Sequence, residues 1–207
     1  MIRGHFYFAQ PQVSGIIYTT QAREVLNGKM TIINTHSGRQ VNIRNPQPET
    51  IDIGDIAHAL TFLCRGGGHT NFFFPVARHC VYCAREARAR GFSKEVVLAC
   101  LLHDASEAYM VDLPKPIKDG LFPEYRTYEN RLLSCIYRKF IGRGLTPDEM
   151  AQVEEIDHTL LMYDLKYLLN LDVELPPIHI ELEYESEPFG HSKAAYIDTF
   201  EKLKGDL

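Results

Sequence analysis

An apolar segment that ends in two ionisable residues constrains the fold of this chain more than any other feature. The residues from Val96 to Leu102 are apolar, His103 and Asp104 follow them directly, and Glu107 lies three positions further on. Burial of ionisable groups costs several kcal/mol unless they are paired or bound to a metal. Helical spacings of three and four residues would bring all three polar side chains to one region. The segment therefore predicts a buried helix whose end holds a cation; the alternative is a capped helix end with a solvated acidic face.

Length and composition predict one globular domain, because 207 residues with 45% hydrophobic side chains can build a sizeable core. A net charge of −5 argues against a broad nucleic-acid-binding surface. No run of about 18 apolar residues occurs, so no membrane span is expected. The segment Met1–His5 lacks the apolar core of a signal peptide, and the five cysteines are odd in number and sparse. We therefore expect reduced thiols and a cytoplasmic location.

Residues 1–50 are expected to form a small β-rich extension of a helical domain that covers residues 51–207. The runs Met30–Asn34 and Arg39–Ile43 are rich in apolar residues. The sequence between them, Thr35–Gly38, is typical of a hairpin turn. This extension could act as a flap or as a contact in a homodimer, although no stripe in the sequence requires a symmetric interface.

Beyond residue 51 the spacing of apolar residues is helical. Caps and prolines set several of the boundaries, because Ser93 and Thr146 can cap helices and a residue before proline avoids helical dihedrals. Helices are predicted over 52–64, 75–89, 94–109, 124–141, 146–169 and 192–204, with a flexible Gly-rich loop over 65–69 and an extended connection over 112–116.

A second set of observations concerns residues that could bind a metal together. Mixed imidazole and carboxylate ligation suits Mn, Fe, Co, Ni, Zn or Mg. The C-x-x-C pair in the second predicted helix has no partner pair and is interpreted as packing. The candidate ligands are His79, His103, Asp104 and Asp157; the thiol pair is Cys80 and Cys83; and two polar residues expected to form only local hydrogen bonds are His158 and Asp164.

The order of these candidate ligands resembles that of the HD-domain metal-dependent phosphohydrolase superfamily. Further matches are Arg65 in a Gly-rich loop, the segment Pro75–His79, and the segment His103–Tyr109 followed by Asp112. They resemble a subgroup that acts on nucleotides and includes bacterial 5′-deoxynucleotidases and phage-type dATP triphosphohydrolases. The resemblance covers about residues 50–170.

This resemblance implies a mainly all-α fold, an HD-domain helical bundle around a central metal site, with the β-rich extension added at the N-terminus. It implies that one divalent cation is held by His79, His103, Asp104 and Asp157. A bound cation lowers the pKa of its water and polarises a phosphoryl oxygen, which allows hydroxide to attack phosphorus. Glu107 would act with Asp104 in catalysis by orienting that water or carrying a proton; the alternative is an exposed acid at the helix end.

Further residues are candidates for substrate binding. By resemblance, Arg65 would bind phosphate oxygens through its forked donors, and Asp112 would contact the sugar hydroxyl. Arg65 could instead be a surface residue, and Asp112 could cap a turn. Lys115 and Lys118 could meet additional phosphates, although lysines are usually solvated. His69 could lie near the mouth of the pocket.

The sequence departs from its resemblance at one position that bears on substrate choice. Close relatives in the subgroup carry a bulky residue after the loop arginine, where this chain has Gly66. Discrimination between ribose and deoxyribose is therefore open, as is the number of phosphates. The expected activity is hydrolysis of a small phosphate ester, such as a nucleotide mono- or triphosphate. The alternatives are a guanosine tetraphosphate hydrolase and an inactive HD-type module that binds a nucleotide or a protein partner.

Overall fold

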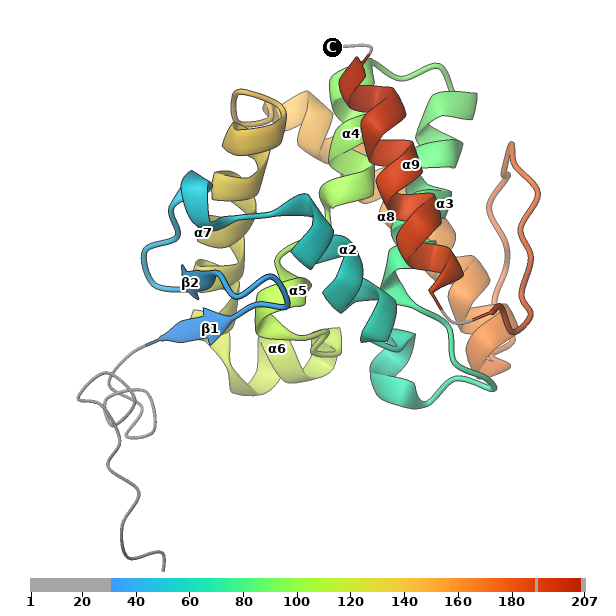
Figure 1. The fold of residues 1–207 in the computed structure, drawn as a ribbon. Helices are drawn as coiled ribbons and strands as arrows, with labels where there is room; N and C mark the ends of the chain where they lie inside the picture. The colour runs from blue at the N-terminus through green and yellow to red at the C-terminus, as the bar shows by residue number, and fades with distance from the viewer. Residues whose placement is uncertain (1–30, 189, 206–207) are drawn as a thin grey trace, which may run out of the picture. The chain divides into compact units, whose positions relative to one another are not determined.

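The computed structural model describes residues 31–188 and 190–205, which form a mainly helical fold (Figure 1). The expected mainly α-helical class is confirmed. Across the described residues, no helix combines the length and apolar character needed to cross a bilayer. The helices of that part are α2 (Ile53–Phe62), α3 (Val76–Ala89), α4 (Lys94–Leu102), α5 (Glu107–Met110), α6 (Lys115–Leu121), α7 (Pro123–Phe140), α8 (Pro147–Leu169) and α9 (His191–Gly205), with 3-10 turns η1 (Pro48–Thr50) and η2 (Arg65–Gly68).

The predicted hairpin is present as two short antiparallel strands, β1 (Ile32–Asn34) and β2 (Gln40–Asn42). The side chain of Val41 on β2 is fully buried in the core. The turn of the hairpin is attached to α2, because the amide and hydroxyl of Ser37 each donate a 2.7 Å hydrogen bond to the Asp55 carboxylate. The hairpin and the helices thus belong to one compact unit. Residues 1–30 of the expected extension lie outside the described residues.

Helix α4 lies at the centre of this unit. Its residues from Val96 to Leu102 are buried, as expected for a helix that is apolar on all sides. It packs against α3, α8 and α9, and Figure 1 shows α9 lying across α3 and α4. The predicted caps are also present: Ser93 accepts a hydrogen bond from the amide of Val96, and Thr146 forms a reciprocal capping box with Glu149 at the start of α8.

The prediction of one continuous helix over residues 94–109 is wrong. Helix α4 ends at Leu102. A turn follows, in which amides donate to carbonyls three residues earlier, and it leads into the short helix α5. The cause is a side chain: Nδ1 of His103 donates to the carbonyl of Cys100 at 2.8 Å. In a continued α-helix that carbonyl would accept the amide of Asp104. The polar residues therefore lie in a turn, directly after the buried helix.

The extended connection predicted over residues 112–116 is shorter than expected. It ends at Pro114, and helix α6 begins at Lys115. Proline is tolerated in the first turn of a helix, where its missing N–H has no helical partner, so Pro116 lies inside α6. Helix α6 was not predicted, because Pro116 was expected to prevent a helix at this point.

Candidate metal centre

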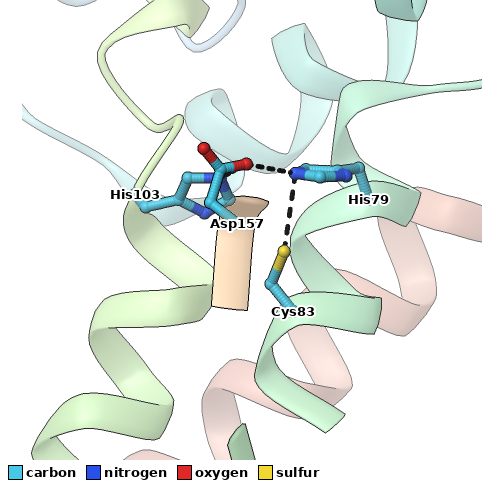
Figure 2. Close-up of side chains that lie close together, drawn as sticks. All are labelled: His79, Cys83, His103 and Asp157. Atoms are coloured by element: carbon cyan, nitrogen blue, oxygen red, sulfur yellow. Dashed lines mark hydrogen bonds and ion pairs between the residues drawn. The ribbon is translucent and has the colours of Figure 1, made fainter. Parts of the chain in front are cut away.

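The structure brings three of the predicted metal ligands, His79, His103 and Asp157, into one group, and the fourth, Asp104, contacts His103. His79 lies in the first turn of α3, His103 and Asp104 directly follow α4, and Asp157 lies in α8. The Nε2 atom of His79 is 3.0 Å from Oδ1 of Asp157. The Nε2 atom of His103 is 3.3 Å from the same oxygen and 3.3 Å from Oδ2 of Asp104. In Figure 2, Asp157 lies between the two imidazoles.

Two observations test whether this cluster fits a divalent cation. First, a carbonyl only accepts hydrogen bonds, so Nδ1 of His103 carries a proton, and Nε2, which faces Asp104 and Asp157, is the nitrogen that a metal would bind in the neutral ring. That Nε2 atom is buried and has no hydrogen-bond partner among the described residues. Second, nitrogen and oxygen ligands that lie about 2.1 Å from one ion are about 3.0–3.4 Å from each other, which matches the separations in the cluster. The residues fit a cation.

The charge states of the cluster favour metal binding by the carboxylates, whereas His103 must lose a proton to bind a metal. Burial alone would lower the pKa of His103, but the neighbouring Asp104 and Asp157 carboxylates raise it well above its ordinary value. Burial opposes ionisation of Asp104, yet His103 and the Arg65 guanidinium lower its pKa to about 2. The carboxylates are therefore charged, which is the form that binds metals.

A third carboxylate positions the first histidine. Oδ2 of Asp164 lies 2.9 Å from Nδ1 of His79, although the two groups are not aligned as a hydrogen bond. The hydroxyl of Tyr184 donates to the other oxygen of Asp164 at 2.9 Å. A carboxylate behind a metal-binding imidazole orients the ring and fixes its tautomer. Asp164 was expected to form only local hydrogen bonds, but it contacts Arg65 and His79, which lie far from it in the sequence.

Arg65 also reaches the cluster, from the Gly-rich turn η2. Its Nε and Nη2 atoms donate to Oδ2 of Asp164 at 3.2 and 3.1 Å, and Nη1 lies 3.4 Å from Oδ2 of Asp104. The turn depends on glycine, because Gly66 and Gly67 have φ angles of 61° and 63°, in the left-handed region that favours this residue. Arg65 is 13% exposed, so the alternative of an ordinary surface arginine does not hold.

Glu107 and Lys118 form a second charged group beside the cluster. Glu107 is buried rather than exposed at the helix end, and its Oε2 atom has no hydrogen-bond partner among the described residues. Burial, and then the Asp104 and Asp112 carboxylates, raise the pKa of Glu107 well above its ordinary value. The Nζ atom of Lys118 lies 3.4 Å from Oε1 of Glu107 and 2.6 Å from Oε1 of Glu129.

Of the remaining predicted substrate residues, Asp112 interacts with charged groups of the cluster, among them Arg65 and Asp104. Asp112 is half-buried, and burial raises the pKa of its carboxyl. His69 follows η2 and is exposed, and Lys115 is exposed at the start of α6. A cavity of about 250 Å³ does open at the cluster, between α7 and α8. Its lining includes His103, Asp104, Asp157, Lys118, Glu129, Asn130, Leu133, Leu145 and Val153.

Sequence reasoning missed one residue of the cluster. Cys83 had been interpreted as packing, but its Sγ atom lies 3.4 Å from Nε2 of His79 (Figure 2). One donor atom from each of His79, Cys83, His103 and Asp157 lies within 4.8 Å of the other three. The available signal was the four-residue spacing of His79 and Cys83, which places both on one face of α3.

Comparison with known proteins adds relatives but no activity. No protein-family model matches the sequence. The uncharacterized protein YfdR of Escherichia coli (strain K12) is 34% identical over 132 residues, which cover 64% of this chain and 69% of YfdR. An uncharacterized protein of Rhodobacter capsulatus is 35% identical over 109 residues, and the chain spans only about half of that relative, 55% of its length.

Proposed function

This chain belongs to the same protein family as YfdR, and we propose that it is a divalent-metal-dependent phosphohydrolase acting on a nucleotide or a similar small phosphate ester. The observation that carries the proposal is the convergence of His79, His103 and Asp157, with Asp104 in contact with His103 and with a buried Nε2 atom of His103 that has no hydrogen-bond partner among the described residues. The resemblance of their order to the HD-domain superfamily supplies the reaction class.

The charge balance of the site supports a cation as well. Acidic groups outnumber the permanent cations of the site, because Arg65 and Lys118 face the carboxylates of Asp104, Asp157 and Asp164, and the two imidazoles must be neutral to bind a metal. A phosphate ester is itself anionic and would be repelled by this set. Neutralisation by a divalent cation would make the cavity suitable for such a substrate.

The residues take distinct roles in this proposal. His79, His103, Asp104 and Asp157 would hold the cation, with the His79 ring oriented by Asp164. When bound, the cation would lower the pKa of a water molecule and polarise a phosphoryl oxygen.

Three further side chains complete the proposed machinery. Glu107, whose pKa is raised, can hold a proton and deliver it to the leaving oxygen. Lys118 lines the cavity and can contact a phosphate oxygen. The guanidinium of Arg65 is held by two carboxylates, and one of its donors can also reach substrate.

The identity of the substrate is proposed only at the level of class. Small-molecule sites are commonly about 300–1,000 Å³, and the cavity of about 250 Å³ would hold part of a nucleotide and leave the rest outside. The five cysteines are free, which supports a reducing, cytoplasmic location. An inactive binding module and a guanosine tetraphosphate hydrolase remain the alternatives that an experiment must separate.

The test is a hydrolysis panel on metal-stripped protein to which Mg, Mn, Co, Ni or Zn is returned. Ribo- and deoxynucleoside mono- and triphosphates and guanosine tetraphosphate are offered, and products are separated by ion exchange. We expect metal-dependent release of phosphate, triphosphate or pyrophosphate, which is lost in Asp157→Asn. The matched control is Asp172→Asn at an exposed position. Stoichiometric metal without turnover of any substrate would contradict the proposal and favour the binding module.

A further inference from the structure

Cys83 occupies a position that simple packing does not explain. Its side chain is fully buried, yet its Sγ atom lies 3.4 Å from an imidazole nitrogen that also contacts Asp157. His79 and Cys83 are four residues apart on α3, so both side chains face α4 and α8 at the level of the cluster. In Figure 2 the sulfur points toward the same space as the two imidazoles and the carboxylate.

Other buried cysteines of the chain provide an internal comparison. Cys100 and Cys135 are also fully buried, but neither belongs to a group of donors that could share an ion in the described residues. The sulfur of Cys135 donates to the backbone carbonyl of Pro46, at 3.6 Å. Cysteine as a small apolar side chain accounts for these two. It does not account for a thiol placed within one group with His79, His103 and Asp157.

We propose that Cys83 is itself a ligand and makes this a thiophilic centre, selective for zinc or another soft divalent metal over magnesium and manganese. The inference rests on the proposed metal site and deepens it. On binding, the S–H bond of Cys83 breaks, a sulfur–metal bond forms, and the proton leaves to the solvent. Thiolate ligands favour zinc, cobalt and iron, whereas magnesium and manganese prefer oxygen. Without the thiolate of Cys83, the site would have only the weaker preference for zinc that its imidazole ligands provide.

The first experiment is a cobalt titration of the metal-stripped full-length chain. A thiolate bound to Co²⁺ produces a near-ultraviolet charge-transfer band that nitrogen and oxygen ligands do not. We expect this band in the wild type, its loss in Cys83→Ser and Cys83→Ala, and its retention in Cys135→Ala. Cys80→Ala is a second comparison, because Cys80 forms a neighbouring group with His103 and Asp104. The band should survive that substitution.

A competition experiment measures the selectivity directly. Wild type and Cys83→Ser are equilibrated with Zn²⁺ and Mn²⁺ together, and the bound metals are quantified by mass spectrometry. We expect the preference for zinc to fall by at least about tenfold in the variant, the scale on which a single altered ligand environment changes affinity. Zinc K-edge absorption on the wild type needs no variant and should report one sulfur at about 2.3 Å.

The outcomes separate this inference from the proposed function. Cobalt or zinc bound by the wild type without a sulfur signal would overturn the assignment of Cys83 and leave the proposed phosphohydrolase intact. A band that disappears in Cys80→Ala but not in Cys83→Ser would overturn it as well. A wild type that binds none of these metals would overturn the proposed function together with the inference.

Discussion

His103 affects both the backbone and the candidate site through one hydrogen bond. Its Nδ1–H group donates to the Cys100 carbonyl, which ends α4 and leaves Nε2 facing Asp104 and Asp157. Adjacent residues on an uninterrupted helix point about 100° apart. The turn after Leu102 therefore contributes to the geometry of the site, because it lets the side chains of His103 and Asp104 point to the same side and contact each other.

Glu107 is the residue at which metal binding and catalysis can be separated. We expect Glu107→Gln to retain metal content, because Glu107 is not among the four proposed ligands, and to lower kcat by about 10²- to 10⁴-fold, the usual contribution of a proton-transfer group. Metal analysis and steady-state kinetics on one preparation check both parts. A variant with unchanged turnover would exclude the proposed role.

Arg65 combines a structural and a functional role. Its guanidinium is paired with Asp104 and Asp164, whose side chains are 15% and 6% exposed. Removal of one partner of a buried ion pair costs about 3–5 kcal/mol, because the other charge remains uncompensated. We expect Arg65→Ala to lower the free energy of unfolding by about 3 kcal/mol and to raise KM, as measured by urea titration and kinetics.

The conservative variant Arg65→Lys distinguishes these effects. It keeps a positive charge near Asp164 but loses the forked donors, so it should recover most of the stability while KM remains raised. Equal stability of the alanine variant and wild type would show that the buried pair contributes nothing measurable.

At the scale of the helices, the capping box stabilises the start of α8, the helix that carries Asp157 and Asp164. Thr146 accepts a hydrogen bond from the amide of Glu149, whose carboxylate accepts one from the Thr146 amide in return. Loss of such a cap typically costs about 1 kcal/mol. We therefore expect Thr146→Ala to lower the free energy of unfolding by about this amount at neutral pH, measured by denaturant titration.

The charge of Glu149 in this capping box makes the free energy of unfolding depend on pH. Hydrogen bonds from Arg143 and then from the Thr146 backbone lower the pKa of Glu149 from 4.5 to about 2. A lowered pKa stabilises the fold above pH 4.5, and this contribution fades as the pH falls toward 2. Glu149→Gln keeps a capping amide, so the stability difference from wild type should be present at pH 7 and shrink toward pH 2. A constant difference would contradict the assignment.

The sequence predicted elements where a local signal was sufficient. The apolar run of α4 and the threonine, proline and glutamate at the start of α8 specify these helices without reference to the rest of the fold. The break at Leu102 was missed because it depends on one side chain binding a carbonyl, which leaves no trace in apolar spacing. Helix α6 was missed because Pro116 lies in its first turn.

At the scale of the whole molecule, the site depends on contacts between distant segments. Residue type and order predicted that His79, His103 and Asp157 would lie together and that Asp104 would lie beside His103. They could not predict that Tyr184, in the segment between α8 and α9, would return to bind Asp164, or that Arg78 on α3 would hold this segment through the Glu185 carbonyl at 2.7 Å. Both contacts depend on how the helices pack, and the proximity of Cys83 to the cluster depends on it too.

The packing of the whole molecule also implies that metal binding increases the free energy of unfolding. The charged carboxylates of Asp104, Asp157 and Asp164 lie beside the buried helix α4. Without a cation they depend on Arg65 and on protonation of His79 and His103 for charge balance. A ligand that binds only the folded state stabilises it by about 2.7 kcal/mol at one hundred times its Kd. For a chain of this size that corresponds to a rise of about 5–10 °C in Tm.

We therefore expect zinc or cobalt at saturating concentration to raise the Tm of metal-stripped protein by about 5–10 °C. In Asp104→Ala the rise should disappear together with retained metal and turnover, because Asp104 lies 3.3 Å from Nε2 of His103 and is a proposed ligand. Differential scanning calorimetry with and without metal checks the shift, and Asp172→Ala serves as an exposed-acid control. A shift of the same size in Asp104→Ala would mean that the stabilising metal binds elsewhere, which would separate the cluster from the cation it is proposed to hold.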